Sequence, residues 1–100
     1  MDEQEQIVIN LIVNSGSARS SAIEAIQYAK AGDLAKADES LQQAKETVNE
    51  AHHSQTELIQ AEIRGEKAPL NLLMVHAQDH YMTSQLAKDL IEALIYCLDK

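Results

Sequence analysis

Apolar residues recur every three or four positions through most of the chain, which is the spacing of one face of an α-helix. The first pattern predicts a helix from about Glu3 to Ala31, and the second predicts a helix from Leu34 to Ile63. The third helix is predicted to begin at Pro69, whose missing N–H is not needed at a first helical position, and to run to near the C-terminus. The apolar positions behind the first two helices are Ile7, Val8, Leu11, Ile12, Ala18, Ala22, Ile26 and Ala29, then Leu34, Ala37, Leu41, Ala44, Val48, Ala51, Leu58 and Ala61.

Two short segments separate these patterns. Gly32 suits the left-handed turn past a helix end, and Asp33 suits the cap of the next helix. Residues 64–68 (Arg-Gly-Glu-Lys-Ala) form the second predicted loop. Because short loops make neighbouring helices antiparallel, the sequence predicts an all-α, up-down-up three-helix bundle, with residues 1–100 as a single domain.

Gly16 interrupts the first helical pattern. A glycine inside a helix costs about 0.5 to 1 kcal/mol relative to alanine, so it can be a tolerated defect. It can equally mark the close approach of another backbone. Both interpretations remain open from the pattern alone.

The predicted helices are long for so short a chain. A helix of about 30 residues is roughly 45 Å long, whereas a compact chain of this length has a gyration radius of about 13 Å. The protomer should therefore be a thin rod that leaves apolar surface uncovered. Side-by-side association into a larger bundle is the expected consequence.

The third helix carries two apolar stripes, and a helix that is apolar on two sides is buried on two sides. One stripe is expected to pack within the protomer and the other between protomers. The first stripe is Leu70, Leu73, Ala77, Ala87, Ile91, Leu94 and Leu98, with His80 and Ser84 set into it. The second stripe is Leu72, Val75, Asp79, Met82, Leu86, Leu90, Ala93 and Cys97.

Asp79 is the one carboxylate in the second stripe. It can turn outward or find a hydrogen-bond donor, which is the more common outcome for such a residue. If the stripe faces a symmetry axis, copies of Asp79 meet, and two carboxylates about 5 Å apart repel by roughly 3 kcal/mol at an effective dielectric near 20. Protonation or a shared hard cation, most simply Mg²⁺, must then offset the repulsion.

His76 lies one turn before Asp79 and His80. It can be a packed or surface residue, or half of a metal-binding pair with His80. The metal pair is a weak match to zinc proteases because Ala77 stands where their glutamate base follows the first histidine. A phosphoryl acceptor would need one exposed, neutral imidazole nitrogen and a ring plane held by neighbours. The helix permits all three interpretations.

Composition and charge exclude several classes of partner and indicate the compartment of the protein. Asp and Glu number 16 against 8 Lys and Arg, giving a net charge of -8, so nucleic acid and anionic membrane surfaces are poor partners. With 45% hydrophobic residues the chain is not expected to be disordered, and no apolar run reaches the roughly 20 residues that span a bilayer. The single cysteine, Cys97, reads as a small core residue, and without an export segment a reducing cytoplasm is the expected compartment.

The segment HAQDHYM, from His76 to Met82, resembles a known family signature, His-(Gly/Ala)-Gln-Asp-His-hydrophobic-Met. That family comprises the enzyme IIA components of the lactose, cellobiose and diacetylchitobiose type in the bacterial phosphoenolpyruvate-dependent sugar phosphotransferase system. The segments SGSARSSAIEAI, AKAGDLAKADESLQQA and EAHHSQTELI match as well, in the expected order and spacing. The resemblance covers essentially the whole chain.

The resemblance implies a three-helix protomer that assembles into a trimeric helical bundle. It implies that His76 receives a phosphoryl group and that Asp79 binds one divalent ion, Mg²⁺, shared by the three subunits. Gln78 and His80 also match the signature. By that match, Gln78 could donate to the phosphoryl oxygens, and His80 could orient His76 or pack at the interface.

The implied activity is a relay. A histidine-containing phosphocarrier protein would bring the phosphoryl group to His76, which would pass it to a cysteine of a IIB component during uptake of a lactose-, cellobiose- or chitobiose-type β-glycoside. The sequence does not reveal which sugar. Two other functions remain: a histidine phosphotransfer module of a two-component pathway, which usually has Lys and Gly where Gln78, Asp79 and His80 stand, and a non-catalytic metal-binding scaffold.

Overall fold

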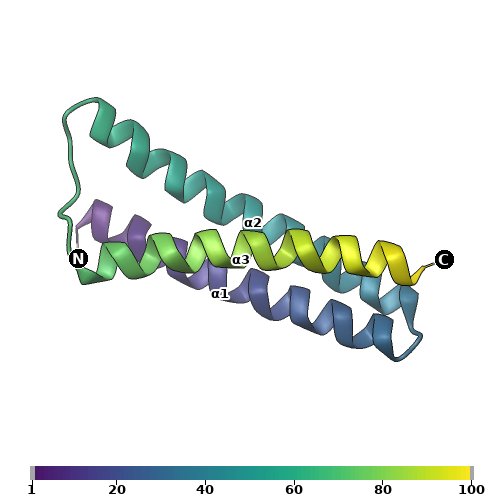
Figure 1. Cartoon of the computed structure of the whole chain (residues 1–100). Coiled ribbons are helices and arrows are strands. Elements are labelled where there is room, and N and C mark those ends of the chain that lie inside the picture. The colour runs from purple at the N-terminus through teal and green to yellow at the C-terminus, as the bar shows by residue number, and fades with distance from the viewer. Residues whose placement is uncertain (1, 100) are drawn as a thin grey trace.

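The computed structural model describes residues 2–99, and over that range it consists of three α-helices: α1 (Glu3–Lys30), α2 (Leu34–Ile63) and α3 (Leu72–Leu98). α1 and α3 run in the same direction and α2 runs against them (Figure 1). The part of the chain described contains no strand, so the predicted all-α, up-down-up bundle is confirmed. The molecule measures 49 × 22 × 19 Å with a radius of gyration of 15.4 Å, as elongated as the helix lengths predict.

The ends of α1 and α2 follow the local signals expected of them. The side chains of Asp2 and Asp33 accept hydrogen bonds from the backbone N–H groups of the first turns, which would otherwise lack partners. Gly32 and Gly65 follow the two helices with φ angles of 87° and 85°, in the left-handed region that glycine enters without steric cost. The turn predicted at Gly32 is therefore confirmed.

α3 begins at Leu72, so the prediction that Pro69 occupies its first position is wrong. The reason is a competing cap. The side-chain oxygen of Asn71 accepts a hydrogen bond from the backbone N–H of Met74 at 2.9 Å, which fixes the helix start after Asn71. Pro69 lies in the connecting segment.

Small side chains fill most of the interface between the helices. Alanines account for much of the core, and small residues let the helix axes approach closely. Tyr81 is the exception: it is the largest fully buried side chain, 1% exposed, and its hydroxyl lies 2.9 Å from Nδ1 of His52 on α2. The buried apolar residues are Val8, Leu11, Ala18, Ala22, Ala25, Ala29, Ala37, Leu41, Ala44, Val48, Ala51, Leu58, Ala77 and Tyr81.

α3 buries little of its own surface in the protomer, where only Ala77, Tyr81 and Ser84 are fully buried. Of the first predicted stripe, the middle packs inward, but Leu70 before the helix and Leu94 and Leu98 near its end are exposed. The first stripe therefore packs within the protomer only along its middle, and the second stripe is the one left on the surface. Tyr81, which belongs to neither stripe, takes the central core position.

The second predicted stripe lies on the surface of the protomer along the length of α3. Its large members are more than half exposed: Leu72 83%, Val75 53%, Met82 56%, Leu86 58% and Leu90 56%. Cys97 belongs to this stripe and is exposed as well, so the prediction that it is a core residue is wrong for the protomer. Among residues 2–99, none of the helices is long and apolar enough to cross a membrane.

Candidate functional site

His76 and His80 form a stacked pair on α3. They are four residues apart and therefore neighbours on the helix surface. Their ring centroids are 5.4 Å apart and the ring planes differ by 16°. His76 is exposed, whereas His80 is half-buried. The outer ring, that of His76, is thus accessible while the inner ring supports one of its faces.

His80 fits against α1 at Gly16. A Cβ atom built on Gly16 would lie only 3.1 Å from Nε2 of His80, closer than nearly all real Cβ contacts. The absent side chain therefore makes room for the imidazole. The sequence left two interpretations of Gly16 open, and the backbone approach was wrong in its group: the group that lies close to Gly16 is the His80 side chain of α3 and not another backbone.

The surroundings of His80 keep its ring neutral near neutral pH. Burial lowers the pKa of His80 most, and the positive charges of Arg19 and of a protonated His76 lower it further. The Asp79 carboxylate opposes these effects by raising the pKa. A neutral His80 has one N–H donor and one free lone pair, so it can hold a neighbouring group without adding a charge.

Asp79 is exposed in the middle of the second stripe, as its outward interpretation predicts for an isolated protomer. Its backbone carbonyl accepts a hydrogen bond from the Thr83 hydroxyl at 2.8 Å. Within residues 2–99, no group of three His, Cys, Asp or Glu side chains is placed to hold a metal ion. The carboxylate fits Mg²⁺ as a hard oxygen donor, but one chain supplies too few ligands, so a metal site here would need further copies.

Gln78 points toward α2 and not toward His76. Its side-chain oxygen accepts a hydrogen bond from Nε2 of Gln55 at 3.0 Å, and its own Nε2 lies 3.6 Å from the sulfur of Met74. Side chains two positions apart do not face each other on a helix. Within one chain, the structure therefore stacks His76 on His80, with Asp79 on the neighbouring part of the same helix, and leaves Gln78 turned toward α2.

Two site neighbours on α1 were not assigned a chemical role by sequence reasoning. Gly16 seats His80, and Arg19 lies one turn further along the same helix, where its charge reaches His80. Both belong to the segment SGSARSSAIEAI. The sequence did contain a signal for these two neighbours. It has a glycine and an arginine three positions apart, on a helix expected to pack beside the helix that carries the histidines.

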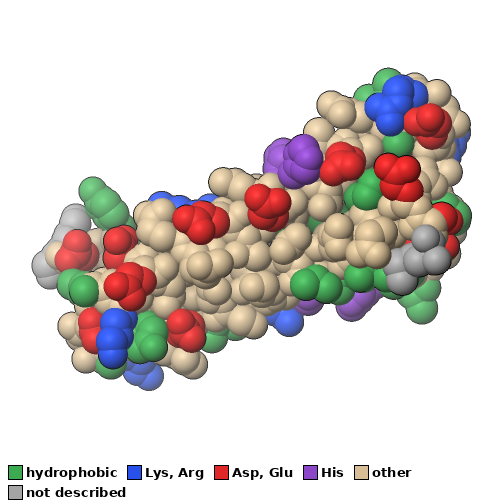
Figure 2. Space-filling view, turned by 180° about the vertical axis from the view of Figure 1, so that it is seen from behind, with side chains coloured by type: hydrophobic (Ala, Val, Ile, Leu, Met, Phe, Trp, Pro, Cys, Tyr) green, Lys and Arg blue, Asp and Glu red, His purple; other side chains and the backbone are tan. Residues whose placement is uncertain are grey.

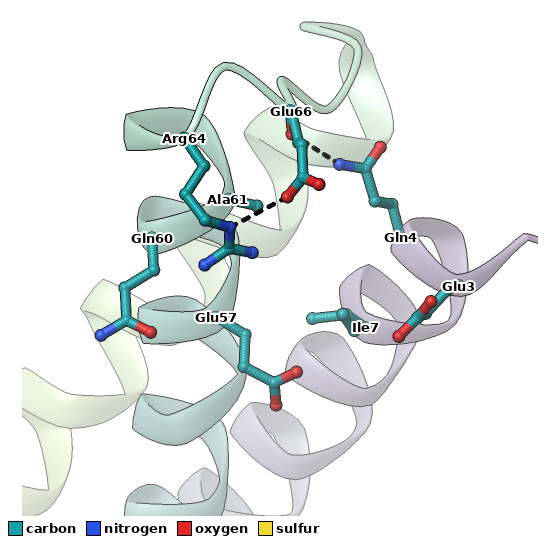
Figure 3. A pocket seen from close by; sticks show the side chains of 8 residues that line it. All are labelled: Glu3, Gln4, Ile7, Glu57, Gln60, Ala61, Arg64 and Glu66. Carbon is teal, nitrogen blue, oxygen red and sulfur yellow. Dashed lines mark hydrogen bonds and ion pairs between the residues drawn. The ribbon is translucent and has the colours of Figure 1, made fainter.

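A hollow of about 410 Å³ lies elsewhere, between α1 and α2. Figure 3 shows the side chains of Glu57 and Ile7 facing into it, with Arg64 bonded to Glu66 at its rim. Ile7 is more than two helical turns before Gly16, so the hollow is well separated from the histidine pair. It contains no histidine or cysteine, and we do not assign the chemistry to it.

Comparisons with known proteins agree on one family. The sequence profile of the lactose/cellobiose-specific IIA subunit of the phosphotransferase system matches residues 6–99. The lichenan-specific phosphotransferase enzyme IIA component of Bacillus subtilis is 50% identical over 99 residues, covering 99% of this chain and 90% of that protein. The N,N'-diacetylchitobiose-specific EIIA component of Escherichia coli K12 is 46% identical, covering 99% of this chain and 85% of that protein.

Solved structures show the same fold. The cellobiose-specific enzyme IIA of Bacillus anthracis superposes with a TM-score of 0.93 at 52% identity, covering 99% of this chain and 91% of that one. The IIA(Chitobiose) chain in the solution structures of its HPr complex from Escherichia coli superposes with a TM-score of 0.82 at 44% identity. The match covers 99% of this chain and 96% of that one.

A three-helix bundle that presents an accessible histidine stacked on a second imidazole is an arrangement that a small helical phosphotransfer protein can use. The chain belongs to the lactose/cellobiose-specific IIA family of the sugar phosphotransferase system, as its resemblance implied. It is accordingly a phosphotransferase component.

Proposed function

We propose that His76 is the phosphoryl carrier of this IIA component. It accepts the group from HPr, the histidine-containing phosphocarrier protein, and passes it to the cysteine of a IIB component. The observation that carries the proposal is the exposed His76 ring stacked on a half-buried His80. A relative 44% identical to this chain has been solved in complex with HPr, which supports HPr as the donor.

The transfer needs alignment more than covalent chemistry from the protein. A free ring nitrogen of His76 attacks phosphorus in line, a new N–P bond forms, and the N–P bond of the donor breaks with its electron pair returning to the donor imidazole. In the second step a IIB thiolate attacks phosphorus and His76 leaves. Stacking on His80 restricts the plane of the acceptor ring and so limits the directions in which its free lone pair can point.

Partner docking rests on apolar contact and shape. The chain carries a net charge of -8, and a bound phosphoryl group adds negative charge, so the net field of the protein does not favour an anionic donor. Leu73 lies one turn before His76, is exposed and does not belong to the second stripe. Its side chain offers an apolar contact beside the accepting ring.

We further propose that three protomers assemble through the second stripe of α3 as a homotrimer. The stripe is exposed over the full helix, and soluble monomers rarely leave so long an apolar surface uncovered. A three-fold arrangement would bring three Asp79 carboxylates together around one shared Mg²⁺. The ion would neutralise their mutual repulsion and thereby stabilise the assembly.

Phosphorylation of the intact protein tests the proposed function. Incubation with phosphoenolpyruvate, enzyme I and HPr should add one phosphoryl group per chain, measured by intact mass spectrometry under non-acidic conditions. Brief acid treatment should remove the group, because a phosphoramidate loses phosphate when its nitrogen is protonated. Addition of a IIB component should also remove it. Absence of an adduct while HPr itself becomes phosphorylated would overturn the proposal.

Replacing Gly16 with alanine should separate stability from activity. The new Cβ forces His80 to shift by a few tenths of an ångström, which disturbs the stack under His76. The substitution also removes a helix-interior glycine, which is worth about 0.5 to 1 kcal/mol to the folded state. We therefore expect an unchanged or higher urea midpoint and a slower phosphoryl uptake from phosphorylated HPr. An unaltered uptake rate would show that His80 does not position His76.

A further inference from the structure

The proposed relay places a dianionic phosphoryl group in a negative environment. The chain has 16 acidic residues against 8 basic ones, and Asp79 lies one turn from His76. Charge on the equatorial oxygens of a transferring phosphoryl group must be dispersed by N–H donors or cations. Several basic side chains are already paired with carboxylates: Lys36, Lys45, Arg64 and Lys88.

Arg19 is placed differently. It follows Gly16 by three residues, so both lie on the same side of α1, and Gly16 is in contact with His80. Helical side chains lean toward the N-terminus of their helix, which directs Arg19 back toward the level of Gly16. Its charge is felt at His80. Figure 2 shows that acidic side chains outnumber basic ones on one face of the molecule, so positive charge is scarce there.

The guanidinium of Arg19 has no competing partner within the described protomer. Among residues 2–99, no carboxylate lies within 4.0 Å of it, and the residue is exposed. Arginine presents several N–H donors in a planar fork that matches phosphate oxygens and stays charged at all physiological pH values. The side chain is therefore charged, accessible and able to bind a phosphoryl group.

We propose that Arg19 is a phosphoryl-binding residue of this site, whose guanidinium donates hydrogen bonds to the oxygens of the group carried on His76. The proposal rests on the proposed role of His76. Arg19 forms and breaks no covalent bond and moves no proton; it offsets the charge that the phosphoryl group brings. Gly16 contributes indirectly, because its missing side chain leaves room for His80 of α3 beside α1.

The test compares Arg19→Gln and Arg19→Lys with Arg64→Gln. Arg64 is the other arginine of the chain, exposed and paired with Glu66 away from the histidine pair, so its replacement is a matched control. Two quantities are measured on the full-length protein: the single-turnover rate of phosphoryl uptake from phosphorylated HPr, and the ³¹P chemical shift of the phosphohistidine formed. Helicity by circular dichroism and oligomeric state by sedimentation are measured in parallel.

We expect Arg19→Gln to slow uptake by about tenfold or more and to move the ³¹P resonance, with helicity and oligomeric state unchanged. Arg19→Lys should recover part of the rate, because it keeps the charge but loses the fork. Arg64→Gln should match the wild type in both measurements. Equal rates and resonances for Arg19→Gln and wild type would overturn the inference, as would a rate loss explained by dissociation of the assembly.

Failure of this inference is distinguishable from failure of the proposed function. If wild type and Arg19→Gln accept the phosphoryl group equally well, His76 remains the carrier and only the role of Arg19 is removed. If the wild type accepts none from phosphorylated HPr, the proposed function itself fails.

Discussion

His76→Ala should take up no measurable phosphoryl group from phosphorylated HPr, a loss of at least about a thousandfold in rate. The substitution removes the nucleophile itself. His80 cannot take its place as an acceptor, because its ring is half-buried against Gly16 whereas that of His76 is exposed. The measurement is intact mass after reaction, combined with a quenched time course under non-acidic conditions. Folding should persist because His76 is exposed and contributes little to the core.

A second variant and a control make this result specific. His76→Gln keeps a planar polar side chain that can lie against His80 but cannot form the phosphoramidate, so it should be equally inactive. His53→Ala removes another exposed histidine, which is paired with Glu57 at 3.3 Å on α2, and should behave as wild type. Full labelling of His76→Ala would contradict the assignment, and peptide mapping would then show which residue carries the group.

Much of the fold follows from local sequence signals. Helical periodicity predicted the three helices, and Asp33 and Gly32 marked one of their boundaries because caps and left-handed turns depend on a few adjacent residues. The start of α3 was mispredicted because two nearby residues are both of types that begin helices. Pro69 suits a first helical position, and Asn71 suits an N-cap. Only the hydrogen bond actually made by Asn71 decides between them.

Which face of α3 turns inward could not be predicted from its sequence. Both stripes are apolar, and the rotation of a helix is set by its neighbours. Tyr81 occupies the core because its hydroxyl meets His52 across the bundle, a contact between residues 29 positions apart. Cys97 is exposed because the second stripe has no covering element within the protomer.

The site was predictable where a local motif carries it and not where distant segments meet. His76, Asp79 and His80 lie within five consecutive positions, and the helix alone places them on one side. The contact of His80 with Gly16, by contrast, is made between residues 64 positions apart on two parallel helices. Gln78 belongs to the same motif, but its hydrogen bond with Gln55 directs it to α2.

Replacing Asp79 with leucine should leave the assembly as stable as the wild type or make it more stable by about 1–4 kcal/mol, while abolishing its response to metal. In the proposed trimer the substitution replaces three repelling carboxylates with side chains that match the surrounding stripe. Each carboxylate pair at about 5 Å contributes roughly 3 kcal/mol of repulsion at an effective dielectric near 20. Thermal unfolding at one fixed protein concentration, with sedimentation to report oligomeric state, measures the effect.

The wild type should lose stability when a chelator is added, because an ion bound only by the assembled state stabilises it by mass action, by about 2.7 kcal/mol at one hundred times the dissociation constant. Asp79→Leu should melt at the same temperature with and without chelator. Asp38→Leu removes an exposed carboxylate from α2 instead and should keep the chelator response of the wild type. If the melting temperature of the wild type does not change when the chelator is added, the Asp79 carboxylates are protonated and share no ion. If Asp79→Leu dissociates, the carboxylates themselves hold the subunits together.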